Sequence, residues 1–213
     1  MELTAVTVLL GNFPALARCN FSAYEGEVVL ISGANGSGKT TLLRTIAGLV
    51  RIHSGSGAVF GVGLRDEVGR RTVRQSVSYL AHGSHLYDDL TVEENLRFIA
   101  RGTKTDWSDI ESMCERMQLP KRIMNLEVAH TSAGQRKKVT LVATLAQGSE
   151  LVLLDEPHAA LDSEAKEIFD RYVAEMASSG ATMLVASHDQ GRVEAFATRT
   201  AEVRGGRVVD QKS

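Results

Sequence analysis

The sequence predicts an α/β protein with a mostly parallel central sheet. Three short apolar runs, at residues 28–32, 151–154 and 182–186, lack the alternation of a half-exposed strand. Runs of this kind are typical of parallel strands that are buried on both faces. Helical spacing of apolar side chains follows at residues 41–50, and a helix is expected from Asp162 or Ser163 to about residue 178. Strands that alternate with helices favour the α/β class.

Length and composition limit the classes of function. The 213 residues correspond to one domain, and 43% of them are hydrophobic, which is enough for a substantial core. Lys and Arg number 24 against 26 Asp and Glu, so no nucleic-acid partner is expected. Cys19 and Cys114 have no metal-site spacing and are expected to be free thiols of a reducing compartment. No secretory signal and no apolar run of about 20 residues is visible, so any membrane role is expected to depend on a partner.

The first 90 residues predict an N-terminal antiparallel β subdomain before and after the first helix. The expected strands are residues 3–10, 16–24 and 58–60, and the expected loops are residues 54–57 and 61–69. Residues 76–81, further along the chain, are also strand-like. Arg70, Arg71 and Arg74 form a small basic cluster, which we interpret as a solvated face.

Residues 91–147 predict a small helical subdomain inserted into this single domain of residues 1–213. Thr91 and Glu94 fit a capping box, which marks a helix start. A second helix is expected over residues 106–119 before Pro120, and a third over residues 132–147. After the last buried strand we expect a short helix near residues 193–197 and a type I′ hairpin turn at residues 204–207.

A glycine-rich loop between the first buried strand and its helix fits the phosphate-binding pattern G-x-x-x-x-G-K-[ST]. Backbone N–H groups of such a loop point at phosphate oxygens, and the helix N-terminus adds partial positive charge. Lys39 supplies a full positive charge, and the Thr40 hydroxyl is a candidate Mg²⁺ ligand. The expected nucleotide contacts are Gly33, Ala34, Asn35, Gly36, Ser37, Gly38, Lys39, Thr40 and Thr41.

Polar residues follow the other two buried strands at their carboxyl ends, where α/β sheets bind ligands. Asp155 is placed to hold Mg²⁺, and Glu156 to orient or deprotonate an attacking water. His188 follows residues 182–186 and is expected to reach the same crevice. Ser132 and Gly134 open a helix whose N–H groups could face an anion, although simple helix capping explains them equally well.

Taken together, these residues resemble the ATP-binding-cassette family over essentially the whole chain. The matching segments are Gly33–Thr40 (Walker A), Ser132–Gln135 (signature), Leu151–Glu156 (Walker B with its glutamate), Ala160–Asp162 (D-loop) and His188 (switch histidine). The order and spacing of the five segments match the family. The resemblance implies a P-loop NTPase core.

The resemblance implies a mechanism in which two cassettes pack head to tail around ATP and Mg²⁺. Lys39, Glu156 and His188 would be catalytic, and Thr40 and Asp155 would hold the metal. Ser132, Gly134 and Asp162 would act on the nucleotide across the dimer. A second copy or a related ATPase and integral membrane subunits are the implied partners. The implied location is the cytoplasmic face of a membrane.

Three positions depart from the family pattern. The glutamine expected after the strand at residues 76–81 is replaced by His82 or Gly83, depending on the register. The aromatic residue that stacks on adenine is replaced by Leu10, with Phe13 the nearest aromatic. Thr131 begins the signature in place of leucine, and little effect is expected.

Within the family, residues 79–98 and 132–136 look like the cytochrome c maturation ATPases of the haem-exporter (CcmA) type. Three functional hypotheses remain open. The first is an ATP-hydrolysing subunit of a membrane transporter, for haem or for another substrate. The second is a nucleotide-gated dimerisation module with weak hydrolysis. The third is a P-loop small-molecule kinase, which would need neither a signature helix nor His188.

Overall fold

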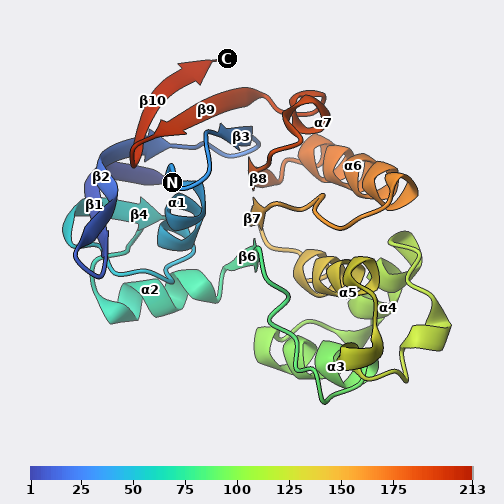
Figure 1. The fold of residues 1–213 in the computed structure, drawn as a ribbon. Helices are drawn as coiled ribbons and strands as arrows, with labels where there is room; N and C mark the ends of the chain where they lie inside the picture. Colours follow the sequence, from blue (N-terminus) through green and yellow to red (C-terminus); the bar gives the residue numbers. More distant parts are fainter. Residues whose placement is uncertain (213) are drawn as a thin grey trace.

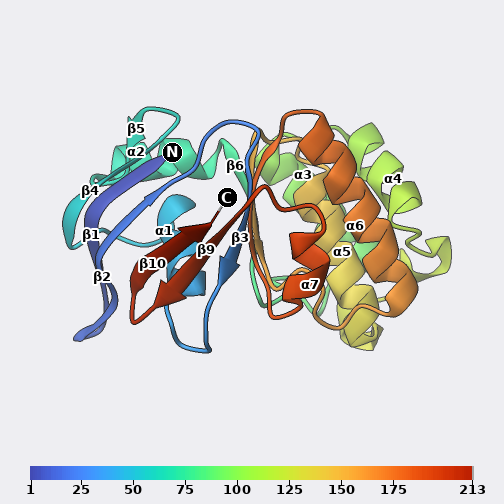
Figure 2. The same cartoon turned by 90° about the horizontal axis from the view of Figure 1, so that it is seen from above.

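The computed structural model describes residues 1–212, which form two β-sheets with helix α1 (Lys39–Ile46) between them (Figures 1 and 2). The first sheet is antiparallel, in the order β2-β1-β4-β5. Its strands are β1 (Glu2–Leu10), β2 (Phe13–Ser22), β4 (Ser54–Val59) and β5 (Val62–Gly63).

The second sheet has the order β10-β9-β3-β8-β7-β6, and only its β9–β10 pair is antiparallel. Its strands are β3 (Val28–Ser32), β6 (Val77–Leu80), β7 (Leu151–Asp155), β8 (Thr182–Ala186), β9 (Arg199–Arg204) and β10 (Arg207–Lys212). All residues of β3, β7 and β8 are buried, as the apolar runs predict. These two sheets confirm the predicted fold class.

Two hydrophobic clusters lie on the two faces of the second sheet. Successive strand residues point to opposite faces, so Val28 and Leu30 join one cluster while Val29 and Ile31 join the other. The first cluster packs the sheet against the helices α3 (Val92–Thr103), α4 (Trp107–Arg116), α5 (Ala133–Leu145) and α6 (Ser163–Ser178). The second cluster packs it against α1 and the antiparallel sheet. The sheet therefore separates the P-loop helix from the other large helices.

Between β6 and β7 the chain forms three helices, α3 (Val92–Thr103), α4 (Trp107–Arg116) and α5 (Ala133–Leu145). Two 3₁₀ turns, Lys121–Ile123 and Val128–His130, connect α4 to α5. The Thr91 capping box is confirmed: Glu94 N donates to Thr91 Oγ1, and Thr91 N donates to Glu94 Oε2 at 2.8 Å. Helices α6 (Ser163–Ser178) and α7 (Gln190–Glu194) complete the chain's helical side (Figure 2).

Several boundaries differ from the predictions. Residues 54–57 belong to β4 because β1 pairs with them, and the predicted loop at 61–69 contains β5 and the start of α2 (Glu67–Arg74). Helix α1 ends at Ile46, earlier than predicted, because Gly48 adopts a φ of +70°. The last short helix begins at Gln190. The predicted I′ hairpin turn is confirmed, since both central glycines have positive φ.

The prediction that Arg70, Arg71 and Arg74 form a solvated face is wrong for two of the three residues. Arg70 is 9% exposed, contacts Glu67 and donates to Arg65 O at 3.0 Å. Arg74 pairs with Glu67 at 2.6 Å and donates to Gly48 O at 2.8 Å. Only Arg71 is a solvated cation of the kind predicted. The cluster therefore fastens α2 to the chain that follows α1.

Both cysteines are free thiols. No helix within residues 1–212 is long and apolar enough to cross a bilayer.

Candidate functional site

The glycine-rich loop joins β3 to α1 at the carboxyl edge of the parallel strands. Gly33, Gly36 and Gly38 have φ values of +137°, +74° and +116°, which side chains rarely allow. Two of these glycines are also crowded. A Cβ on Gly33 would lie 2.2 Å from Val203 O of β9, and one on Gly38 would lie 2.8 Å from Ala15 O of β2. The glycine-rich loop is therefore held between β9 of one sheet and β2 of the other, in a conformation that side chains at Gly33 and Gly38 would disrupt.

Lys39 is the first residue of α1, and its side chain folds back over this loop. Its Nζ donates to Gly33 O at 2.7 Å and to Ala34 O at 3.1 Å. The residue is 7% exposed. A buried ammonium group held by two carbonyl oxygens places a positive charge inside the loop, where a phosphate would bind.

Asp155 ends β7 at the same edge of the sheet as the loop. The residue is 1% exposed, and its Oδ2 atom has no hydrogen-bond partner. Leaving a buried carboxylate oxygen unpaired costs free energy, so such groups usually mark a site for a cation or another ligand. Ser37 Oγ in the loop is buried without a partner too.

Glu156 and His188 lie against each other across the ends of β7 and β8. His188 Nε2 is 3.4 Å from Glu156 Oε1, and His188 N donates to Glu156 Oε2 at 3.1 Å. Glu156 has a φ of +51°, a strained conformation that the hydrogen bond from its N–H to Ala186 O supports at 2.8 Å. The structure thus brings together two of the three residues predicted to be catalytic.

The signature residues lie on the other side of the sheet. Ser132 caps α5 in a reciprocal pair with Gln135, and Gly134 lies close to Ala160, whose carbonyl oxygen would be 3.0 Å from an added Cβ. Asp162 caps α6 by accepting from Ala165 N at 2.8 Å. Figure 2 places α5 and α1 on opposite faces of the parallel sheet. Ser132 and Gly134 therefore lie on the opposite face of the sheet from the helix that follows their own chain's glycine-rich loop.

Comparison with known proteins places this geometry in a family. The family profile described as ABC transporter matches residues 16–159, which is more than half of the chain.

The chain belongs to the ABC transporter family.

Among the relatives, the glutamine transport ATP-binding protein GlnQ of Escherichia coli (strain K12) is 30% identical over 99% of this chain and 90% of its own length. The Fe(3+) ions import ATP-binding protein FbpC 1 of Rhodococcus jostii (strain RHA1) is 33% identical over 98% of this chain. The chain spans 60% of the length of that iron-import relative.

A solved structure of the ATP-binding cassette MJ0796, described as a dimer in a post-hydrolysis state bound to ADP and Pi, is 25% identical. It covers 100% of this chain, which covers 97% of it in turn, with a TM-score of 0.91. The chain is therefore an ATP-binding cassette in sequence and in fold. Its predicted enzyme class, a transport-coupled ATP hydrolase of the ABC type, agrees with this family.

Lys137 is a site residue that the sequence analysis did not identify in this ABC cassette. It lies on α5, is 9% exposed, and donates from Nζ to Glu156 O at 2.8 Å. Burial lowers its pKa to about 8, while the charges of Asp155 and Glu156 act in the opposite direction. Its local sequence resembles an ordinary basic helix face. Only the packing of α5 beside the end of β7 reveals the contact.

Two of the three positions that depart from the family pattern are exposed, whereas Thr131 is 9% exposed and donates from Oγ1 to Val128 O at 2.7 Å. Leu10 and Phe13, at the β1–β2 turn, are 54% and 76% exposed, so both are free to contact a base. His82 is exposed after β6, and an added Cβ on Gly83 would meet nothing within 4 Å.

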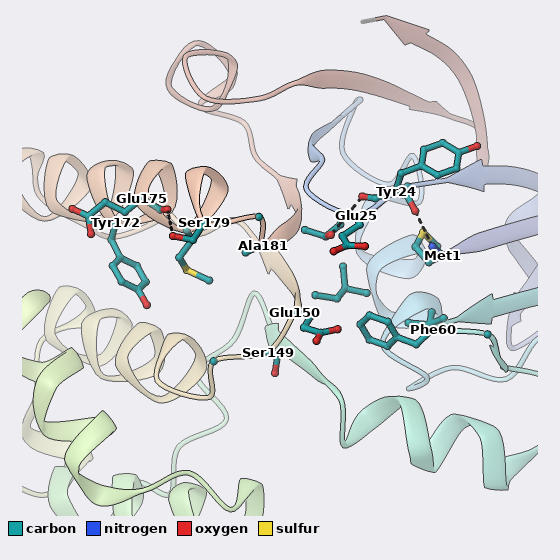
Figure 3. Close-up of a pocket in the computed structure, with 18 of the residues that line it drawn as sticks. Met1, Tyr24, Glu25, Phe60, Ser149, Glu150, Tyr172, Glu175, Ser179 and Ala181 are labelled. Atoms are coloured by element: carbon teal, nitrogen blue, oxygen red, sulfur yellow. Dashed lines mark hydrogen bonds between the residues drawn. The ribbon is translucent and has the colours of Figure 1, made fainter.

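A large cavity among the described residues lies at the opposite edge of the sheet. It has a volume of about 950 Å³ and is lined by residues that precede β7 and β8, such as Glu150 and Ala181 (Figure 3). Tyr24, Phe60 and Tyr172 add aromatic rings from separate elements. The nucleotide loop is not part of this cavity.

Proposed function

We propose that this ABC cassette binds ATP with Mg²⁺ and hydrolyses it to ADP and phosphate in order to drive separate membrane subunits. The observation that carries the proposal is the shared sheet edge. There the clamped loop with Lys39, the unpaired Asp155 oxygen and the Glu156–His188 pair come together. Phosphoryl transfer needs this combination of phosphate positioning and a group that orients water.

We assign the loop residues 33–41 to the triphosphate. Lys39 would exchange its two carbonyl contacts for phosphate oxygens and neutralise negative charge. Glu156 would orient the attacking water or accept its proton. His188, which is 56% exposed, would hold the terminal phosphate.

We propose that Thr40 and Asp155 hold Mg²⁺. Within the described residues, no group of three or more His, Cys, Asp or Glu side chains could hold a metal. Mg²⁺ needs only one or two protein oxygen ligands when phosphates and waters supply the rest, and the buried, unpaired Asp155 Oδ2 meets that need. When bound, Mg²⁺ neutralises charge on the phosphate oxygens.

We propose that two copies, or this chain and a related ATPase, assemble head to tail. Ser132 and Gly134 then serve the nucleotide of the partner, and Asp162 lies at the same interface. Their place on the opposite face of the sheet from α1 supports this arrangement, because an exposed helix N-terminus there has no phosphate of its own to bind. The dimeric cassette MJ0796 gives further support.

We propose residues 91–147 as a helical subdomain that contacts the membrane partner at the cytoplasmic face of the membrane. Phe98 of this subdomain and Tyr87, which precedes it in the chain, are each 55% exposed and form an edge-to-face pair with ring centroids 5.2 Å apart. Exposed aromatic pairs of this kind often mark interaction surfaces.

Replacement of Glu156 by glutamine tests the activity. In steady-state assays with Mg²⁺, the wild-type chain should release phosphate, and Glu156→Gln should reduce kcat by at least about 100-fold. Glu150→Gln is the matched control, since Glu150 directly precedes β7 while Glu156 directly follows it. Unchanged turnover in Glu156→Gln would refute the role given to this carboxylate.

A nucleotide-gated dimerisation module is a second candidate. The missing family glutamine, whose position falls on His82 or Gly83, and the exposed Leu10 favour it. This function predicts an ATP-induced dimer in light scattering together with slow or absent phosphate release by the wild-type chain.

The transported substrate stays a prediction. The relatives carry names for iron import, glutamine transport and, at 29% identity, a probable multidrug transporter. The resemblance of residues 79–98 and 132–136 to cytochrome c maturation ATPases favours haem handling, a reading that none of these relatives' names supports. A pull-down from detergent-solubilised host membranes tests it: a multi-span partner with a haem absorption band is expected, and a partner without haem would refute it.

A further inference from the structure

A carboxylate on α6, Asp170, bridges the two loops that carry the proposed catalytic pair. Its Oδ1 atom is 2.7 Å from His158 Nε2, and its Oδ2 atom accepts from Arg192 Nη1 at 2.9 Å. The side chains of His158, Asp170 and Arg192 are 3%, 21% and 33% exposed. One side chain therefore holds partners from two different segments in a largely buried position.

The two partners follow the proposed catalytic residues closely in the sequence. His158 lies two residues after Glu156, and its ring also packs edge-to-face on Phe169 of α6 with centroids 5.1 Å apart. Arg192 belongs to α7, four residues after His188.

The loop of His188 has a second link to α6 through the next residue, Asp189. Its Oδ2 is 3.3 Å from Lys166 Nζ of α6 and 3.5 Å from Arg192 Nε. Both catalytic loops are thus fastened to one helix, and Asp170 is the point at which the two attachments meet.

The direct contact between the catalytic residues is weaker than this network. His188 Nε2 and Glu156 Oε1 are 3.4 Å apart, and the His188 side chain is 56% exposed. Helix α7 has five residues, too few to be stable without tertiary contacts. Short hydrogen bonds to a charged carboxylate in a buried position are stronger and more directional. The geometry of the pair therefore depends on contacts behind the loops.

We propose that Asp170 is a positioning residue that couples the Glu156 loop to the His188 loop and sets the separation of these two side chains. This inference rests on the proposed ATPase function. Asp170 itself does not touch the nucleotide loop; it acts through His158 and Arg192.

The test is the isosteric change Asp170→Asn. Asparagine replaces one carboxylate oxygen with an NH₂ group, which donates instead of accepting. One of the two neighbours, His158 or Arg192, therefore loses its acceptor oxygen. We expect kcat for ATP to fall about tenfold or more while KM changes less than about twofold, because loop displacement of about 1 Å misplaces catalytic groups without altering the phosphate loop. Glu175→Gln is the matched control on the same helix, since the Glu175 carboxylate is 62% exposed and pairs with Arg116 of α4. It should leave kcat unchanged.

A spectroscopic readout separates positioning from general loss of structure. In ¹H–¹⁵N spectra of histidine side chains, Asp170→Asn should move the His188 ring resonances toward their positions in Glu156→Gln, and Glu175→Gln should not. If Asp170→Asn is too unstable to purify, the double-mutant cycle of His158→Ala and Arg192→Ala replaces it. Their effects on kcat should be non-additive, because both act through Asp170.

The outcomes separate the two proposals. Wild-type hydrolysis with an unchanged kcat and unchanged His188 resonances in Asp170→Asn overturns the coupling alone, as does full additivity in the cycle. A fall in kcat that is matched by an equal rise in KM indicates damage to nucleotide binding and also overturns it. A wild-type chain that binds ATP without hydrolysing it overturns the proposed function instead, and the His188 resonances then still decide whether Asp170 couples the loops.

Discussion

Gly33 is crowded by its neighbours, so its replacement by alanine should lower the free energy of unfolding by a measurable amount. Gly33 has a φ of +137°, and an added Cβ would lie 2.2 Å from Val203 O and 2.8 Å from Ser37 Oγ. Gly33→Ala therefore combines backbone strain, which costs about 1–3 kcal/mol, with overpacking against a strand, which costs about 1–3 kcal/mol more. A gain of about 0.4–1 kcal/mol from the stiffer unfolded chain offsets little of this.

Gly36 is the matched control in the same loop. Its φ is +74°, but an added Cβ meets nothing within 4 Å. In Gly36→Ala, only the left-handed backbone conformation costs free energy, about 1–2 kcal/mol. The same gain from the stiffer unfolded chain reduces the net loss of unfolding free energy to about 1 kcal/mol. Taking the middle of each range, we expect Gly33→Ala to lose about 2–3 kcal/mol more unfolding free energy than Gly36→Ala.

Urea denaturation followed by circular dichroism measures this difference, and titration with a fluorescent ATP analogue measures its effect on the site. Gly33→Ala should also weaken nucleotide binding by more than about tenfold, because relief of the overlap with β9 displaces the loop. Equal losses of stability in the two variants would refute the close approach of loop and strand described here.

Three further predictions follow from the site. Asp155→Asn should raise the Mg²⁺ concentration needed for hydrolysis at least about tenfold, because a neutral amide replaces the carboxylate assigned to the metal; a Mg²⁺ titration of phosphate release checks this. Burial lowers the pKa of Lys137 from 10.5 to about 8, so between these pH values the unfolded chain binds more protons and this residue's contribution to stability rises with pH, by up to about 3 kcal/mol. Lys137→Met should remove that rise, and identical pH profiles of wild type and variant in urea denaturation would contradict the assignment. Leu10→Ala and Phe13→Ala should each change stability by less than about 0.5 kcal/mol, because both side chains are exposed, whereas the one that covers the base should weaken ATP binding; a normal affinity in both variants would show that neither does.

Sequence reasoning was most accurate where the signal is local. The strands of the parallel sheet, the glycine loop and the Thr91 capping box depend on contiguous residues, whose periodicity and backbone preferences can be read directly. It failed at β4, where serine and glycine predict a loop. Pairing with β1 overrides that preference, because hydrogen bonds to a neighbouring strand do not depend on the side chains of residues 54–57.

The candidate site also has residues that the sequence predicts and contacts that only the folded chain reveals. Asp155, Glu156 and His188 could be proposed from the sequence because each follows a buried strand at the edge where such sheets bind ligands. The contact between Glu156 and His188 joins residues 32 positions apart, and that between Lys137 and Glu156 joins residues 19 apart. No motif within a single segment of the sequence predicts these contacts.

The fold class, the phosphate loop and the family resemblance can be derived from the sequence, since these depend on short motifs in a fixed order. The folded chain was needed to find that Asp155 keeps an unpaired oxygen, that Lys137 reaches the backbone of Glu156, and that Asp170 joins two loops. The physical reason is that burial, pairing and pKa shifts depend on which segments pack together, and packing brings together side chains that are distant in the chain.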